Sequence, residues 1–214
     1  NAFIEHASTT NLENAIEDLV GVEKKEQFFN LYRKNYIIEK DIVFLAKEGF
    51  NALRIPLHYK HFSPSPNVFI NEGFDLLDPI VELCKENNIY LILDMHAAPG
   101  AQNTNDFSDS DGETAKLFTQ YENQIWLAST WRYIAEHYAD EPIIAAYDLL
   151  NEPLPERTNA YQEYGHLLEP LYKRLTSEIR KVDTMHMITL EGANWSNNWD
   201  MFNKPFDDNT FYQF

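Results

Sequence analysis

The sequence is poor in cysteine and in basic residues. It contains one cysteine, Cys84, among 214 residues. A single cysteine excludes an intrachain disulfide and a cysteine-based metal cluster, and we interpret Cys84 as a small buried core residue. The 17 Lys and Arg stand against 34 Asp and Glu, which gives a net charge of −17. Because nucleic-acid binding requires clustered basic residues, this composition excludes a nucleic-acid partner and favours a neutral ligand.

Several sequence signals are also missing. No apolar run is long enough to cross a bilayer, which indicates that the protein has no membrane partner. The first residues, NAFIEHASTT, contain neither a starting Met nor a basic segment followed by an apolar one. We therefore expect the natural N-terminus to lie upstream of Asn1, and the sequence leaves export open. Neither a G-x-G-x-x-G fingerprint nor a P-loop is present, which disfavours nucleotide binding.

What the sequence does contain is typical of a folded globular protein. Hydrophobic residues make up 44% of the chain and aromatic residues 14%, enough for one substantial core. We find no internal repeat and no Gly/Ser-rich or Pro-rich linker. The sequence therefore predicts a single domain over residues 1–214, and it leaves the oligomeric state open.

Short apolar runs alternate with longer amphipathic segments along the chain. Runs that favour strands lie at 51–57, 89–95, 143–150, 187–192 and 210–214, and segments that favour helices at 36–49, 72–88, 123–139 and 161–182, with a kink expected at Pro170. The strand runs are almost continuously apolar, as in parallel strands covered on both faces. The pattern predicts an α/β fold, either an open doubly wound sheet or a closed (β/α)8 barrel.

Polar residues at the strand ends favour the barrel. Arg54, His96, Asn151, Glu152 and Glu191 each lie within or just after an apolar run, and barrels build their sites from the carboxyl ends of several strands. A complete (β/α)8 barrel takes about 250 residues. Only five strand runs are readable here, so we expect an incomplete barrel.

Glu152 is the strongest candidate for chemistry. A carboxylic acid at a buried strand end can have its pKa raised by desolvation, stay protonated near neutral pH and donate a proton to a leaving oxygen. Asn151 can bind a substrate hydroxyl, and Pro153 favours an extended backbone at Glu152. Arg54 can orient a carboxylate and His96 can bond hydroxyls. Taken singly, these are also ordinary capping, ion-pair and core residues.

Five segments together resemble glycoside hydrolase family 5, a family of retaining (β/α)8 glycosidases. They are FNALRIP, LILDMHAAPGAQN, AAYDLLNEP, MITLEGANW and PFDDNTFYQF, in this order. The resemblance implies that Glu152 is the general acid/base, that Asn151 binds a substrate hydroxyl, that Arg54 supports the nucleophile and that His96 lines the subsite of cleavage. It also implies a secreted or periplasmic protein.

The resemblance further implies what the chain lacks. We find no first strand of the family pattern, and the family nucleophile, a Glu on the seventh strand, has no match. We therefore expect a barrel fragment that covers about strands two to six and is inactive alone. Retaining glycosidases need a second carboxyl about 5 to 5.5 Å from the acid. Glu191 also ends a strand, but the resemblance gives it a supporting or subsite role.

The predicted ligand is a β-linked oligo- or polysaccharide. Aromatic rings pack against the C–H faces of sugars, and amides bond their hydroxyls, so we predict substrate-binding roles for Trp195, Asn194, Glu191, Gln102 and Asn103. We predict no cofactor and no metal site, because no H-E-x-x-H motif and no EF-hand loop with oxygen ligands at both ends is present. The linkage and the mode of cleavage stay open, as does the alternative of a non-catalytic carbohydrate-binding barrel.

Overall fold

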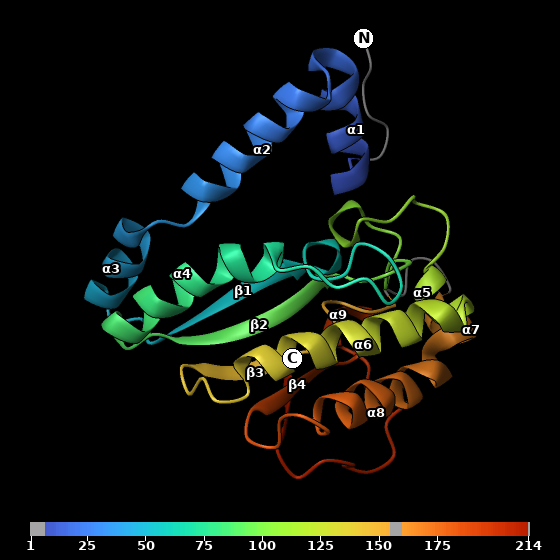
Figure 1. Ribbon diagram of the computed structural model, residues 1–214. Coiled ribbons are helices and arrows are strands. Elements are labelled where there is room, and N and C mark those ends of the chain that lie inside the picture. The colour runs from blue at the N-terminus through green and yellow to red at the C-terminus, as the bar shows by residue number, and fades with distance from the viewer. Residues whose placement is uncertain (1–6, 155–159, 214) are drawn as a thin grey trace.

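The core of the molecule is a sheet of five parallel strands (Figure 1). The computed structural model describes residues 7–154 and 160–213. Its strands are β1 (Ala52–His58), β2 (Tyr90–Ala97), β3 (Ile144–Asp148), β4 (Met187–Glu191) and β5 (Thr210–Gln213), and their order in the sheet follows the chain. All five predicted strands are confirmed. A doubly wound sheet reverses its strand order at a switch point, so this sequential order is that of an arc of a (β/α)8 barrel.

Three of the predicted helices are confirmed as α3 (Glu39–Lys47), α4 (Glu72–Asn87) and α6 (Tyr121–Tyr138). Shorter helical segments lie in the connections: α5 (Lys116–Thr119), α9 (Ala193–Ser196), η1 (Tyr59–His61) and η2 (Asp106–Ser108). Helix α4 shows how the sequence pattern acts. Phe74, Leu77, Val81 and Cys84 are buried at the three- and four-residue spacing of one helix face. Asn88 then adopts a left-handed φ of 54° that ends the helix.

The segment 161–182 is not the single kinked helix that we predicted. It contains α7 (Ala160–Tyr164), the 3-10 turn η4 (Gly165–Leu167) and α8 (Leu168–Ile179). Pro170 is therefore in the first turn of α8, where its missing N–H leaves no hydrogen bond unmade. The break precedes the proline, at Gly165, where an added Cβ would lie 3.0 Å from the ring of Tyr161.

The two faces of the sheet differ in chemistry because side chains alternate along each strand. One face is apolar and packs against α4, α6 and α8 (Figure 1), with Leu93, Tyr147 and Leu190 fully buried. The indole of Trp131 in α6, for example, lies 5.7 Å from the ring of Tyr147 in β3. The opposite face carries Arg54 and several carboxylates, and this face positions the candidate site.

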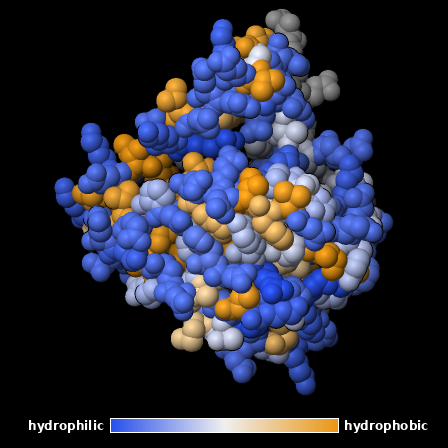
Figure 2. Space-filling view, viewed as in Figure 1, coloured by the Kyte–Doolittle hydropathy of each residue, from blue (hydrophilic) through white to orange (hydrophobic). Residues whose placement is uncertain are grey.

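Two helices that the sequence analysis did not predict, α1 (Thr9–Val20) and α2 (Val22–Tyr36), form a hairpin that stands away from the sheet (Figure 1). Neither contains a buried residue, so packing against the core imposes little on their sequence. Figure 2 shows the hollow below this hairpin. It is a cleft of about 440 Å³ whose lining includes Arg33, His58 and Lys60.

Asp109 attaches the hairpin to the rest of the molecule. Its carboxylate accepts hydrogen bonds from the backbone N–H and the hydroxyl of Thr10, at 2.7 and 2.6 Å, and from Lys60 Nζ at 2.9 Å. Its Oδ2 also lies 3.1 Å from His58 Nε2. Burial alone would raise the pKa of Asp109, but these hydrogen bonds lower it well below its usual value.

None of the helices in residues 7–154 and 160–213 combines the length and the apolar character needed to span a bilayer.

Candidate active site

The strand register gathers the polar side chains on one face of the sheet. Asp94 of β2 pairs with Asp148 of β3, and Glu191 of β4 pairs with Gln213 of β5. Asp94 and Asp148 are completely buried, and Glu191 is 3% exposed. Because all the strands are parallel, these residues lie at the same end of the sheet, together with Arg54 of β1.

Arg54 is the centre of this cluster. Its Nε and Nη2 lie 2.9 and 2.8 Å from Asp148 Oδ2, and its Nη1 lies 3.1 Å from Asp94 Oδ2. Nη2 also donates to Glu191 Oε1 at 2.8 Å and to Asn151 Oδ1 at 3.1 Å. One planar guanidinium therefore holds the ends of four strands in a fixed arrangement.

The electrostatics follow from placing three carboxylates around this one cation. Burial would lower the pKa of Arg54, but the charges of Asp148 and Asp94 raise it. Burial, followed by the neighbouring Asp94 and Glu191, raises the pKa of Asp148 well above its usual value. Burial also raises the pKa of Glu191, against the opposing effects of the Glu152 N–H and Arg54. The cluster carries more acidic groups than its one guanidinium can neutralise.

His96 and Asn151 connect this buried cluster to the open rim. His96 Nδ1 lies 2.6 Å from Asp94 Oδ2, so Nδ1 donates to this carboxylate and, in the neutral ring, Nε2 is an acceptor. Asn151 is 4% exposed, and its Nδ2 lies 3.5 Å from His96 Nε2. Because Arg54 occupies Asn151 Oδ1, the amide presents its N–H groups to this space. The predicted grouping of Arg54, His96 and Asn151 is thus present.

Glu152 lies on the same rim and is half-buried. Its backbone N–H donates to Glu191 Oε2 at 2.8 Å, and its carbonyl accepts from Asn103 Nδ2 at 2.9 Å. The expected extended backbone is wrong, because Glu152 has a φ of 43°. These two hydrogen bonds hold it in the left-handed region, which is costly for a residue with a Cβ. Such strain is typical of functional sites, and the Glu152 carboxylate bonds to none of the other described residues.

Gln102 and Asn103 do not have the substrate-binding positions that we predicted. They are 0% and 1% exposed. Gln102 Nε2 donates to the carbonyls of His96 and Asn151 at 2.7 and 3.0 Å, and its Oε1 accepts from the N–H of Ala98. Because their amides already bond the backbone, both residues hold the loop after β2 against the loop after β3.

The contacts of Glu191 fit the supporting role rather than the substrate-binding role, both of which the sequence left open. Its Oε1 accepts from Arg54 and, at 3.2 Å, from Gln213 Nε2, while its Oε2 accepts from the Glu152 N–H. The buried carboxylate has both oxygens occupied, so it positions Arg54 and Glu152.

Asn194 and Trp195 form an unusual turn after β4. Their φ values are 53° and 54°, and Ser196 continues at 58°, which makes a short left-handed turn of non-glycine residues. The backbone N–H of Asn194 donates to the carbonyl of Leu154 at 3.1 Å, which joins this turn to the loop of Glu152. Both side chains are half-buried, and their substrate-binding role stays a prediction. Trp199 packs against Phe202 and Tyr212.

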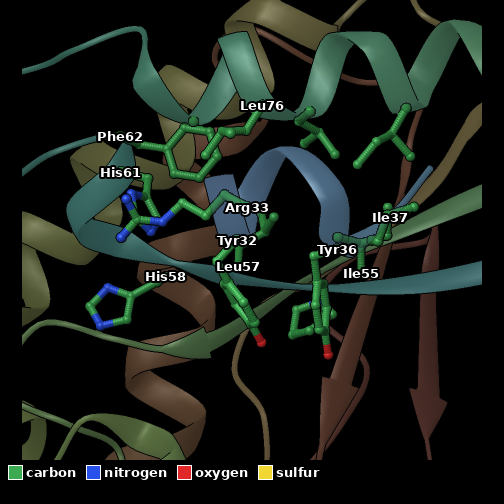
Figure 3. Close-up of a pocket in the computed structure, with 14 residues that line it drawn as sticks. Tyr32, Arg33, Tyr36, Ile37, Ile55, Leu57, His58, His61, Phe62 and Leu76 are labelled. Atoms are coloured by element: carbon green, nitrogen blue, oxygen red, sulfur yellow. The ribbon is translucent and has the colours of Figure 1, made fainter. Parts of the chain in front are cut away.

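A separate cavity of about 170 Å³ lies beside β1, between α2 and α4 (Figure 3). Its lining is mostly apolar and includes Tyr32, Tyr36, Ile55 and Leu76. None of the predicted site residues lines it. Among the described residues, no group of three or more His, Cys, Asp or Glu is arranged to hold a metal ion.

Sequence reasoning gave Asp94 and Asp148 no role of their own, although the structure places both against Arg54. The signal was present in the alternation of strand residues. Side chains alternate along a strand, so Asp94, two residues before His96 in β2, lies on the same polar face as His96.

Comparison with known proteins agrees with this geometry. The cellulase model of glycosyl hydrolase family 5 matches residues 12–214. A beta-xylosidase of Phanerodontia chrysosporium is 37% identical over 193 residues, which cover 88% of this chain and 38% of that protein. Endoglucanase C of Acetivibrio thermocellus is 28% identical, with 82% of this chain and 48% of that protein covered.

Solved structures show the same fold. The crystal structure of Pseudomonas stutzeri endoglucanase Cel5A aligns with a TM-score of 0.64 at 23% identity, over 82% of this chain and 51% of its own. Endoglucanase Cel5A from Thermotoga maritima gives a TM-score of 0.64 at 20% identity, over 82% of this chain and 52% of its own. The chain thus spans about half the length of the proteins it matches. With a family match over residues 12–214, the chain belongs to glycosyl hydrolase family 5.

Proposed function

We propose that the protein hydrolyses β-linked glycans with retention of configuration, and that Glu152 is its general acid/base. The single observation that carries this proposal is the position of Glu152. Its half-buried carboxyl, without a protein partner among the described residues, stands on the same rim as Arg54, His96 and Asn151. A proton donor without a competing partner, beside groups that bond hydroxyls, is the arrangement that glycosidic cleavage requires.

The steps of the reaction assign a role to each neighbour. Glu152 protonates the departing sugar oxygen and later removes a proton from the attacking water, as the acid/base of a retaining enzyme does. The N–H groups of Asn151 and Nε2 of His96, whose nitrogen atoms lie 3.5 Å apart, bond hydroxyls of the sugar at the cleavage point. Trp195 and Asn194 bind a neighbouring sugar, the ring through its face and the amide through hydroxyls.

The attacking carboxylate is a Glu outside residues 1–214. Glu191 is disfavoured for this role because its two oxygens accept hydrogen bonds from Arg54, Gln213 and Glu152. We propose that Arg54, which already holds two strand-end aspartates, also supports that nucleophile.

The substrate class is a β-linked oligo- or polysaccharide. The names of the relatives include a beta-xylosidase, endoglucanases, a cellodextrinase and a probable glucan 1,3-beta-glucosidase, so the linkage is the finer question. Because a polymeric substrate does not enter cells, we propose a secreted or periplasmic location.

The decisive experiment separates proton donation from binding. In the protein that carries this chain, Glu152→Gln should lower hydrolysis of an unactivated β-glucan by about 10²- to 10⁴-fold, the usual contribution of a general acid. An aryl β-glycoside whose phenolate leaves without a proton should lose much less in its first step. Glu122→Gln, at an exposed position of α6, is the matched control and should leave both rates unchanged.

An equal loss in the first step on both substrates would contradict a proton-donating role. The alternative, a non-catalytic carbohydrate-binding barrel, predicts instead that neither substrate is turned over. Glucan binding, measured by calorimetry, should be nearly unchanged in Glu152→Gln for an enzyme and for a binding barrel alike, so hydrolysis is the measurement that separates the two.

A further inference from the structure

Asp94 and Asp148 form an unusual pair below the rim of the candidate site. They are register partners on adjacent strands and are completely buried. Each contacts Arg54 through Oδ2, Asp94 at 3.1 Å from Nη1 and Asp148 at 2.8 Å from Nη2. The other oxygen of each, Oδ1, is buried and has no hydrogen-bond partner. Two unpartnered carboxylate oxygens on one face of neighbouring strands demand a physical explanation.

The charged and polar groups around the pair do not provide a partner for these two oxygens. Arg54 of β1 is the permanent cation that faces the pair, and it also bonds the carboxylate of Glu191 from β4. His96 of β2 contributes its Nδ1 to Asp94. From α8, Tyr172 donates its hydroxyl to the backbone carbonyl of Glu191 at 2.9 Å, and so offers nothing to the pair. Glu152 adds a further carboxyl on the rim.

Full ionisation would therefore leave an excess of buried negative charge. Asp94, Asp148 and Glu191 would carry three negative charges against one guanidinium. Burying a charge without a partner strongly destabilises the folded protein. A protonated carboxyl, in contrast, is a hydrogen-bond donor. One proton would remove a charge and give one of the two unpartnered oxygens a hydrogen to donate.

We propose that the pair of Asp94 and Asp148 holds one proton at neutral pH, so that the pair carries a single negative charge beneath Arg54. The pair acts on the site through Arg54, so these are positioning residues. Because the pair then carries only one negative charge, the guanidinium attracts the oxygen of Asn151 and carboxylates at the rim more strongly. This inference goes beyond the proposed function, because it holds whether or not the protein cleaves a glycan.

A second buried aspartate shows why the environment decides the protonation state. Asp183 is 2% exposed, yet its oxygens accept from the hydroxyl of Tyr147 and from the backbone N–H groups of Met185 and His186. Burial would raise the pKa of Asp183, but hydrogen bonds from His186 and Tyr147 lower it to about 2. Burial acts on both aspartates, whereas Asp148 faces other carboxylates and its pKa is raised.

The test is the carboxyl carbon resonance of the aspartates in the ¹³C-labelled protein. At neutral pH we expect one aspartate with the chemical shift of a protonated acid, and Asp183 with that of a carboxylate. In Asp148→Asn and in Asp94→Asn the protonated signal should be lost, because the repulsion between the two carboxylates, which favours protonation, is then removed. Asp183→Asn is the matched control and should retain it.

The wild-type spectrum alone can overturn the proposal, even if the variants fail to fold. If every aspartate shows the shift of an ionised carboxylate at neutral pH, the pair holds no proton and the proposal is wrong. A protonated signal that persists in both Asp94→Asn and Asp148→Asn would assign the proton elsewhere and would equally refute the pair.

Discussion

Replacing Arg54 by Met tests the charge balance of the site most directly. Methionine retains most of the unbranched stem but removes every donor from Asp94, Asp148 and Glu191, which are 0%, 0% and 4% exposed in their side chains. Removing one partner of a buried ion pair costs about 3–5 kcal/mol. Since domains are stable by about 5–15 kcal/mol, we expect Arg54→Met to lose a large part of the free energy of unfolding.

The loss of unfolding free energy should depend on pH, in a direction set by the pKa values of the buried carboxyls. The folded-state pKa values of Asp148 and Glu191 are already raised, and without Arg54 they rise further. A carboxyl whose pKa is raised on folding stabilises the protein below its unfolded pKa and loses that contribution as the pH rises through the folded value. The variant should therefore be closer to wild type near pH 5 than near pH 8.

Urea unfolding followed by tryptophan fluorescence at these two pH values measures the effect as a shift in midpoint at constant slope. Arg132→Met is the control. Arg132 is exposed and its Nη1 lies 4.0 Å from Glu178 Oε2, a geometry worth about 0–1 kcal/mol. If Arg54→Met costs no more than Arg132→Met, or costs the same at both pH values, the guanidinium does not neutralise buried carboxylates and our reasoning fails.

Three further outcomes are expected from other parts of the structure. Gly192→Ala should destabilise the protein by about 1–3 kcal/mol in the same assay, because the new Cβ would lie 2.6 Å from the carbonyl oxygen of Asn198; an unchanged midpoint would contradict the close approach. Asp183 has its pKa lowered to about 2 on folding, so the stability it contributes should be lost as the pH falls below its unfolded value near 4, and Asp183→Asn should flatten this acid limb. Asp109→Asn weakens the contacts with Thr10 and Lys60, and we expect faster amide hydrogen exchange in α1 with no change in β3; equal exchange in α1 would show that other contacts hold the hairpin.

The alternation of strands and helices was readable because burial imposes a pattern on sequence. Tyr147 and Leu190 lie on faces covered by helices, so these positions are apolar wherever the strand is enclosed. The unpredicted α1 and α2 contain no buried residue. Because neither helix packs against the core, burial gave no signal for them, and helix propensity alone is a weak signal.

The sequence predicted which residues belong to the candidate site, but only partly what each of them does. Glu152, Asn151, Arg54 and His96 were identified because polar residues at the ends of apolar strands stand out. Gln102 was predicted to bind substrate and Glu191 to have a supporting or subsite role, because a polar residue near a strand end can equally bond a ligand, the backbone or a neighbouring side chain. Only the distances from Gln102 to the carbonyls of His96 and Asn151 separate these roles.

The sequence by itself therefore determined the α/β pattern, the five parallel strands and the residue types at their ends, since these depend on periodicity and local chemistry. The tertiary structure decided which carboxylates share Arg54, which oxygens of Asp94 and Asp148 have no partner, and which amides are occupied by the backbone. Hydrogen bonds and buried charges act over a few ångströms between residues as far apart in the chain as Arg54 and Glu191. Such contacts exist only once the strands are packed side by side.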